Sequence, residues 1–455
     1  MESNPTEVKR NESALEDRSE KNFTRANVMA REDKIRLVDS DEESGLDLFC
    51  YNRCSNEDDP FIQQCRGLVF HGENLLLKAF AYTPEYSQAD TELLEKIFSS
   101  NFREWTFYKS YEGALLRMFF FSGKWFISTH RKLNAYRSKW SSRDSFGTLF
   151  ERALEVEESS NPEFKKRVVQ PPTAVDNGSG VWQTVPTLSI LERFQNSLDK
   201  NKQYMFLLRN TTENRIVCDA PTSSPLLFHV GTYENGSLNM TENINLSYPQ
   251  RINFLNIDEL LDFVAKQDYH HLQGVIGFGA NCRQVKILND TYLELFRARG
   301  NEPSVKFRYL QVRMNKKLTD LLYKLYPNMA EEFDEYEKII YSIAERILKD
   351  YLQRFINKRF VTVPREDFAI IRECHDWHLQ DRANHRISLN KVITVLNKQP
   401  ATNLNAMIRR FKIDSSNKSD VPPREYKGSR NNSPAINPVV APISLLKRIP
   451  APKLN

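Results

Sequence analysis

The sequence has no long apolar run and no regular cysteine spacing. No stretch of about 18 or more apolar residues occurs, although a membrane-spanning helix needs one. The N-terminal sequence MESNPTEVKRNESALEDRSEKN lacks the apolar core of a secretory signal peptide. The six cysteines are scattered and match no disulfide framework. We therefore expect an intracellular, cytoplasmic protein with reduced thiols and no membrane partner.

Charge of one sign is not in large excess either. The 455 residues include 64 Lys and Arg against 59 Asp and Glu, which gives a net charge of +5. Such a balance permits a polyanionic partner without requiring one, so only local clusters of charge can indicate whether the protein binds a polyanion. Hydrophobic residues make up 40% of the chain, which is enough for two or three domains with apolar cores.

The pattern of residues divides the chain into four regions. Residues 1–45 are polar and charged, and we expect a disordered or loosely ordered arm. Residues 46–316 carry short apolar segments broken by polar turns, with a polar loop insertion at about 157–186. Residues 317–413 repeat apolar side chains every three or four positions, which predicts a helical domain. Residues 414–455 form a basic tail rich in Pro, Asn and Ser, typical of disorder.

The most informative stretch lies between Tyr108 and Trp140. An apolar run at 114–121, a Ser122-Gly123 turn and a second run at 125–129 predict two antiparallel strands. The dipeptide Glu112-Gly113 precedes this hairpin, and a basic cluster follows it, made of His130, Arg131 and Lys132. An acid, a glycine and several cations in one stretch suggest a site that handles phosphate.

Mixed elements on both sides of this hairpin predict an α+β fold. Strands are expected at 66–70, 75–80, 204–208, 215–218, 274–278 and 284–288. Helices are expected after Asp90, from 146, over 188–198 and after Asn256, and then at 333–355, 367–379 and 389–398.

Five short motifs follow one another in a recognisable order. They are Cys65 to Phe70, Tyr111-Glu112-Gly113, Thr212 to Val217, Gln273 to Ile276, and Val285-Lys286-Ile287 with Tyr292. In order and spacing, residues 60 to 315 resemble the nucleotidyltransferase domain of ATP-dependent RNA ligases of the bacteriophage RNA ligase 1 type. Similar proteins occur in large DNA viruses, for which the location would be the host cytoplasm or the virion. The resemblance implies antiparallel sheets followed by an all-helical C-terminal domain.

The resemblance also implies a chemistry. In that family a lysine attacks the α-phosphate of ATP, with Mg²⁺ held by carboxylates and cations placed around the phosphates. ATP and Mg²⁺ would be the cofactors of an active member, and RNA or another nucleic acid would be the partner. Carried over by position, Lys109 and Glu112 are the candidate catalytic residues. The candidate nucleotide-binding residues are Arg66, Gly67, Gly113, Arg215, Gln273 and Lys286.

The chain departs from the family pattern at its most demanding positions. The family places the nucleophilic lysine three residues before the glycine, where this chain has Ser110, and Lys109 stands one residue too early. Neighbouring side chains of a strand point to opposite faces, so Lys109 should point away from the site unless a bulge corrects the register. Further departures are leucines at 207 and 208 and Gln273 where the family has glutamates, and Leu288 in place of a second lysine.

Three functions remain open on this basis. The first is a ligase-like protein that binds nucleotide or nucleic-acid ends with weakened or lost ligation chemistry. The second is an active ATP-dependent RNA ligase that forms a lysyl-AMP intermediate on Lys109. The third is a structural or interaction module built on the ligase fold. No metal site is predicted. The Cys and His groups near 50–71 fit no standard zinc spacing, and those near 374–385 lie in a charged helical segment, where a solvated or packed histidine pair is more common than a metal site.

Overall fold

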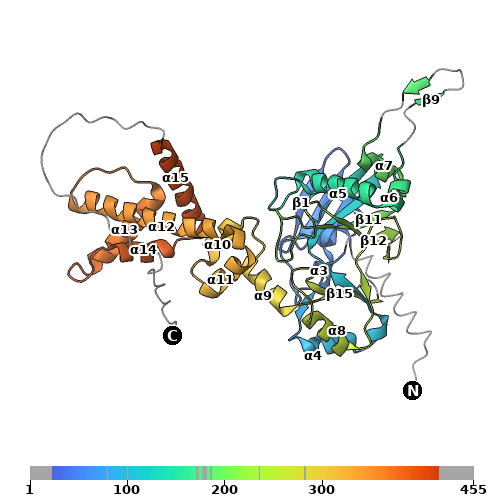
Figure 1. Ribbon diagram of the computed structural model, residues 1–455, viewed down its shortest axis with the longest axis horizontal. Helices are drawn as coiled ribbons and strands as arrows, with labels where there is room; N and C mark the ends of the chain where they lie inside the picture. The colour runs from blue at the N-terminus through green and yellow to red at the C-terminus, as the bar shows by residue number, and fades with distance from the viewer. Residues whose placement is uncertain are drawn as a thin grey trace.

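The computed structural model describes residues 23–78, 80–99, 101–170, 174–176, 182–184, 187–234, 236–280 and 283–419. Within these residues the expected α+β class is confirmed: antiparallel sheets occupy the first two thirds of the chain and helices the last third (Figure 1). No helix in these ranges is both long and apolar enough to cross a membrane. The N-terminal residues before 23 and residues 420–455 of the expected tail lie outside the described residues. The prediction of a disordered tail is wrong for residues 414–419, which belong to the helix Ala401–Ser419.

The N-terminal sheet has four antiparallel strands in chain order. They are β1 (Ile35–Asp41), β2 (Leu46–Tyr51), β3 (Arg66–His71) and β4 (Asn74–Leu77). The expected arm at 1–45 is therefore wrong for residues 23–45, where α2 (Arg25–Met29) buries Val28 and β1 pairs with β2. As an edge strand, β1 carries charges at Arg36, Asp39 and Asp41, and these obscured the apolar alternation that marks a strand.

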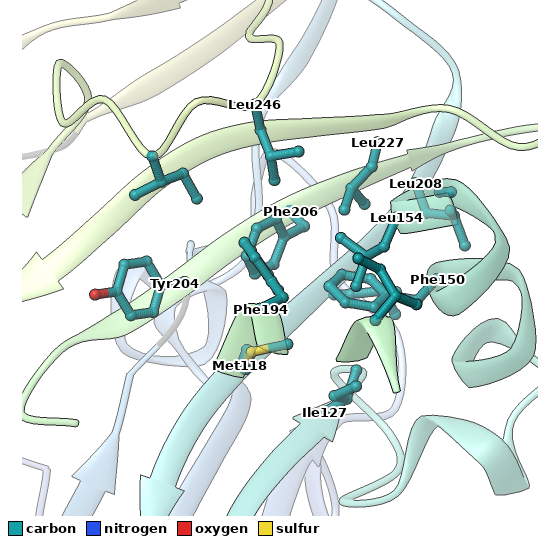
Figure 2. Close-up of a cluster of buried hydrophobic side chains, with 14 of the residues drawn as sticks. Met118, Ile127, Phe150, Leu154, Phe194, Tyr204, Phe206, Leu208, Leu227 and Leu246 are labelled. Atoms are coloured by element: carbon teal, nitrogen blue, oxygen red, sulfur yellow. The ribbon is translucent and has the colours of Figure 1, made fainter. Parts of the chain in front are cut away.

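The second sheet, here the β7 sheet, contains the predicted hairpin. Its order is β13 (Ser237–Asn239), β12 (Leu227–Glu234), β11 (Gln203–Arg209), β7 (Gly113–Phe121) and β8 (Lys124–Ser128). Ser122 and Gly123 join β7 to β8 with φ angles of 49° and 82°, as a tight hairpin turn requires. One face packs under α5 (Phe146–Ser160), α6 (Pro162–Arg167) and α7 (Ile190–Asn196), and Figure 2 shows Phe150, Phe194 and Phe206 meeting there.

The third sheet, here the β6 sheet, brings together strands from distant parts of the chain. Its order is β14 (Arg251–Ile252), β6 (Thr106–Ser110), β15 (Gly274–Phe278), β16 (Gln284–Leu288) and β5 (Glu85–Ser87). All its pairings are antiparallel except that of β16 with β5. One face buries Phe107, Val275 and Ile287 under α4 (Thr91–Phe98) and α8 (Ile257–Ala265).

The C-terminal third is helical. It consists of α9 (Asp290–Arg299), α10 (Val305–Val312), α11 (Lys316–Leu325), α12 (Ala330–Tyr351), α13 (Arg365–Gln380), α14 (Leu389–Asn397) and α15 (Ala401–Ser419). Helices α9 to α11 lie between the sheets and the body formed by α12 to α15 (Figure 1). The apolar repeat of α12 buries Phe333, Ile340, Ile343 and Ile347 in one core with α13, α14 and α15.

Two local predictions are wrong. The expected loop at 157–186 is helical over 157–167, because α5 continues to Ser160 and α6 begins at Pro162, with Asn161 capping its N-terminus and Phe164 buried. Part of the rest forms a two-stranded pair, β9 (Ala174–Asp176) with β10 (Trp182–Thr184). The expected strand at 215–218 is an irregular segment, whose backbone amides bind a side chain instead of a neighbouring strand.

Candidate functional site

The segment Tyr111-Glu112 connects the β6 sheet to the β7 sheet. Ser110 is the last residue of β6, and Gly113 is the first residue of β7. Gly113 approaches β11 so closely that a Cβ atom would lie 2.4 Å from the carbonyl oxygen of Leu208. Glycine at this position therefore allows β7 to pair closely with β11 at the motif. The expectation from the sequence was a close approach to a nucleotide, and the structure places a strand backbone there.

A chain of hydrogen bonds joins the substituted motif positions. Ser110 Oγ donates to Gln273 Oε1 at 3.0 Å, and Gln273 Nε2 donates to Tyr292 Oη at 2.8 Å. Tyr292 in turn donates its hydroxyl to Glu112 Oε1 at 2.9 Å. The two residues that stand where the ligase motifs have a lysine and a glutamate thus contact each other directly. These four hydrogen-bonded residues, Ser110, Gln273, Tyr292 and Glu112, include no lysine amine that could act as a nucleophile.

Glu112 is held by the irregular segment that follows β11. Its carboxylate accepts hydrogen bonds from the backbone amides of Val217, at 2.9 and 3.2 Å, and Cys218, at 3.1 Å. The side chain is only 2% exposed, and burial raises the pKa of Glu112 while these hydrogen bonds lower it. Both carboxylate oxygens already have protein donors, so Glu112 acts as a link between the Tyr111-Glu112 connection and residues 217–218.

Lys109 lies on the other face of β6 from Ser110. It pairs with Val275 in β15, and β6 and β15 pair over five residues without a register shift. Cross-strand partners share a face, so Lys109 points to the side where Val275 and Phe107 are buried under α4 and α8. No bulge turns Lys109 toward Glu112, and Lys109 is not part of the series of hydrogen bonds that links Ser110 to Glu112.

Arg215 and Lys286 are each held by local partners. Arg215 forms an ion pair with Asp219 at 2.8 Å and donates to the backbone carbonyl of Leu325 at the end of α11. Lys286 forms an ion pair with Glu85 at 3.0 Å in the adjacent strand. The structure therefore places these two expected phosphate-binding cations in separate ion pairs with local carboxylates.

Arg66 belongs instead to a cationic cluster that we define as Arg66, Arg117, His130 and Arg131. The last three come from β7 and the segment after β8, next to the start of β3. The pKa of His130 is lowered to about 3, first by burial and then by the neighbouring guanidinium groups of Arg66, Arg117 and Arg131. Among the described residues, no carboxylate forms an ion pair with any of these three arginines.

Arg117 is the buried member of the cationic cluster. Its side chain is 1% exposed, and its guanidinium donates to the backbone carbonyls of Gly67 and, at 2.7 Å, Thr129. Its Nε atom has no hydrogen-bond partner, and burial lowers the pKa of Arg117 to about 9. Uncompensated buried charge is costly, so the cluster favours binding of an anion. Sequence reasoning missed Arg117, although a lone arginine inside the apolar strand 114–121 was a signal.

Gly67 packs directly against this cluster. Its φ of 74° lies in the left-handed region, and a Cβ atom would come within 2.8 Å of the Cα of His130. The glycine expected to bind a nucleotide therefore lets β3 approach the His130 segment, so that its carbonyl can accept from Arg117.

Arg209, at the end of β11, is a second buried cation that sequence reasoning missed. It is 7% exposed, and its guanidinium carbon lies 4.4 Å from the ring centre of Tyr111 and 5.6 Å from that of Phe228. Its Nε atom has no hydrogen-bond partner. Arg209 faces Gly113 across the strand pair, so it adds positive charge beside the Tyr111-Glu112 connection.

These features define an α+β protein in which hydrogen bonds link Ser110, Gln273 and Glu112 where two five-stranded sheets join, with a helical C-terminal part. No protein-family model matches the chain. It is similar to the immediate-early protein ICP-46 homolog of Invertebrate iridescent virus 6, at 27% identity over 416 residues, which are 87% of each chain. It is also similar to immediate-early protein ICP-46 of Frog virus 3 (isolate Goorha), at 26% identity over 280 residues, which are 60% of this chain and 64% of that one.

Among solved structures, a candidate ATP-dependent DNA ligase from Aquifex aeolicus overlaps 67% of this chain and 70% of its own. The sequence identity is 10% and the TM-score is 0.34. Because this TM-score is too low to establish a common fold, the ligase resemblance depends on the five sequence motifs.

Proposed function

We propose that this chain is an RNA ligase-like protein of nucleotidyltransferase fold that binds nucleotide or phosphorylated nucleic-acid ends, with weakened or lost ligation chemistry. The observation that carries the proposal is the hydrogen bond from Ser110 to Gln273. A hydroxyl and an amide take the positions of the motif lysine and glutamate, and they satisfy each other. Adenylyl transfer needs an unpaired amine beside charged carboxylates, and positions 110 and 273 provide neither.

The cationic cluster supports the binding half of the proposal. Arg66, Arg117 and Arg131 gather without a carboxylate among the described residues, and His130 between them is held neutral by burial. Guanidinium groups bind phosphate oxygens in a bidentate manner, which suits a terminal phosphate. Nucleotide binding by Glu112, Gly113 and Gln273 remains part of the proposal.

A resident Mg²⁺ does not fit the donors of this site. The described residues contain no group of three or more His, Cys, Asp or Glu side chains that could hold a metal ion. Glu112 is the only carboxylate in the hydrogen-bonded chain, and backbone amides and Tyr292 occupy its oxygens. ATP and Mg²⁺ therefore belong to the active-ligase alternative, in which Lys109 would have to change faces.

The first test asks whether the protein forms a covalent AMP adduct. The full chain, Lys109→Ala and Ser110→Lys would be incubated with labelled ATP and a divalent metal and run on a denaturing gel. We expect no adduct on the native chain. A label on the native chain that disappears in Lys109→Ala would establish the active-ligase alternative and overturn the proposal.

The second test asks whether a phosphate end is recognised. Binding of oligonucleotides with a 5′-phosphate and with a 5′-hydroxyl would be compared for the native chain, Arg131→Glu and the exposed control Arg103→Glu. We expect tighter binding of the phosphorylated end, lost in Arg131→Glu and kept in Arg103→Glu. Equal binding of both ends, or none, would leave the structural or interaction module as the function.

A further inference from the structure

The helical body carries an exposed basic segment between α12 and α13. Helix α12 ends at Tyr351, a π-helical turn follows at Leu352–Ile356, and α13 begins at Arg365. Lys358 adopts a φ of 54°, which takes the chain out of the helix. Single π-helical turns are uncommon and occur often at functional sites. The segment is far from the cationic cluster along the chain and belongs to a separate hydrophobic core.

Positive charge is uncompensated in this segment. From 351 to 365 the sequence YLQRFINKRFVTVPR has four cations, Arg354, Lys358, Arg359 and Arg365, and no acidic residue. Residues 356 to 360 are all exposed. Within the described part of the chain, none of the four cations forms an ion pair with a carboxylate. The charges are therefore available to a partner.

Flat rings lie among these cations. Phe360 is 92% exposed, the largest exposed fraction of any large hydrophobic side chain in the described residues. Phe355 stacks on His375 of α13, with ring centres 4.0 Å apart and planes 28° apart, and on Tyr351 at 5.0 Å. The pKa of His375 is lowered first by burial and then by His378, and Arg382 and Lys358 make smaller contributions.

We propose that residues 352–365 bind single-stranded nucleic acid, with phosphates at Lys358 and Arg359 and a base stacked on Phe360. An exposed aromatic ring between cations matches the two needs of a single strand, a stacking platform and backbone neutralisation. A lipid surface fits less well, because the three polar residues that separate Ile356 from Phe360 would enter the bilayer with them. An acidic peptide would use the cations but not the ring.

The test uses the full chain and an unstructured RNA of about 20 nucleotides, since a single binding site covers roughly 4 to 16 nucleotides. The RNA has a 5′-hydroxyl, so that recognition of a phosphorylated end does not enter the measurement. The variants are Phe360→Ala and the double variant Lys358→Glu with Arg359→Glu. Matched controls are Leu255→Ala, which removes an apolar side chain that is 86% exposed, and Lys96→Glu with Arg103→Glu, which makes the same change of charge elsewhere.

We expect Phe360→Ala to weaken binding by about tenfold, as loss of one stacked base does. The double charge variant should weaken it further and reduce the slope of log affinity against log salt by about 0.7 for each lost phosphate contact. The controls should bind like the native chain, and single-stranded DNA should show the same pattern if stacking and charge suffice.

Three results would overturn the inference. One is RNA binding that is equal in the native chain and both variants. Another is binding to anionic vesicles that depends on Phe360 while RNA binding does not. The third is binding of a polyglutamate peptide that competes for the cations but is unaffected in Phe360→Ala.

Discussion

Ser110 Oγ and Gln273 Oε1 lie 3.0 Å apart, across the junction where β6 ends and β15 begins. The two residues are 163 positions apart in the sequence. Each replaces a charged residue of the ligase motifs with a neutral one, and each replacement provides the hydrogen-bond partner of the other. The two departures from the motif are therefore one structural feature.

Ser110→Ala should destabilise the protein. It removes the donor to Gln273 Oε1 in a site where Ser110 is only 4% exposed, which leaves a half-buried acceptor without this partner. We expect a loss of about 1–3 kcal/mol in the free energy of unfolding, measured by urea denaturation. Ser99→Ala is the control, because Ser99 is exposed and its hydroxyl donates to a carbonyl at the surface. Equal stability of the two variants would contradict the prediction.

Tyr292→Phe tests whether the hydrogen bonds that link Ser110, Gln273, Tyr292 and Glu112 are energetically coupled. The hydroxyl accepts from Gln273 and donates to Glu112, so its loss leaves Gln273 Nε2 without this acceptor and leaves Glu112 Oε1 with the amide of Val217 as its donor. The free energy of unfolding should fall by about 1–3 kcal/mol. In a double-mutant cycle with Ser110→Ala the two losses should not add, because both residues bond to Gln273. Additive losses would mean that the two hydrogen bonds are independent.

His130 should make stability depend on pH in the acidic range. Its pKa is lowered from 6.5 to about 3 in the folded protein, first by burial and then by Arg66, Arg117 and Arg131. The unfolded chain binds the proton more tightly, so this contribution is complete above pH 6.5 and is lost as the pH falls toward 3. Between pH 6.5 and 5 the loss is up to about 2 kcal/mol. His130→Gln should remove this slope, whereas exposed His271→Gln should keep it.

Gly67→Ala should destabilise more than Gly72→Ala. Both glycines have a positive φ, 74° and 57°, so both variants suffer the backbone cost of about 1–2 kcal/mol. Only at position 67 would the new Cβ meet the backbone of His130 at 2.8 Å, whereas nothing lies within 4 Å at position 72. The difference in the free energy of unfolding between the two variants isolates the contact of β3 with the cationic cluster. Equal free energies of unfolding for the two variants would show that β3 and the His130 segment are loosely packed at this contact.

Local patterns predicted the elements well. The hairpin of β7 and β8, the strands β15 and β16 and the helices α13 and α14 lie within one or two residues of their predicted positions. The alternation of strands and the repeat of helices are properties of neighbouring residues, so the sequence displays them directly. The local pattern failed to predict β1, because charged residues interrupt its apolar alternation. It also failed at Asn161, where a cap begins a second helix directly after the first.

The sequence by itself provided five short motifs that resemble those of ligases and showed that Ser110 and Gln273 depart from that pattern. Only the tertiary structure decided that these two residues bond to each other, that Lys109 lies on the opposite face, and that Arg215 and Lys286 are held in separate ion pairs. It also brought Arg117 and His130 to Arg66. Such contacts join strands that are distant in the chain, and their register is set by the packing of whole sheets.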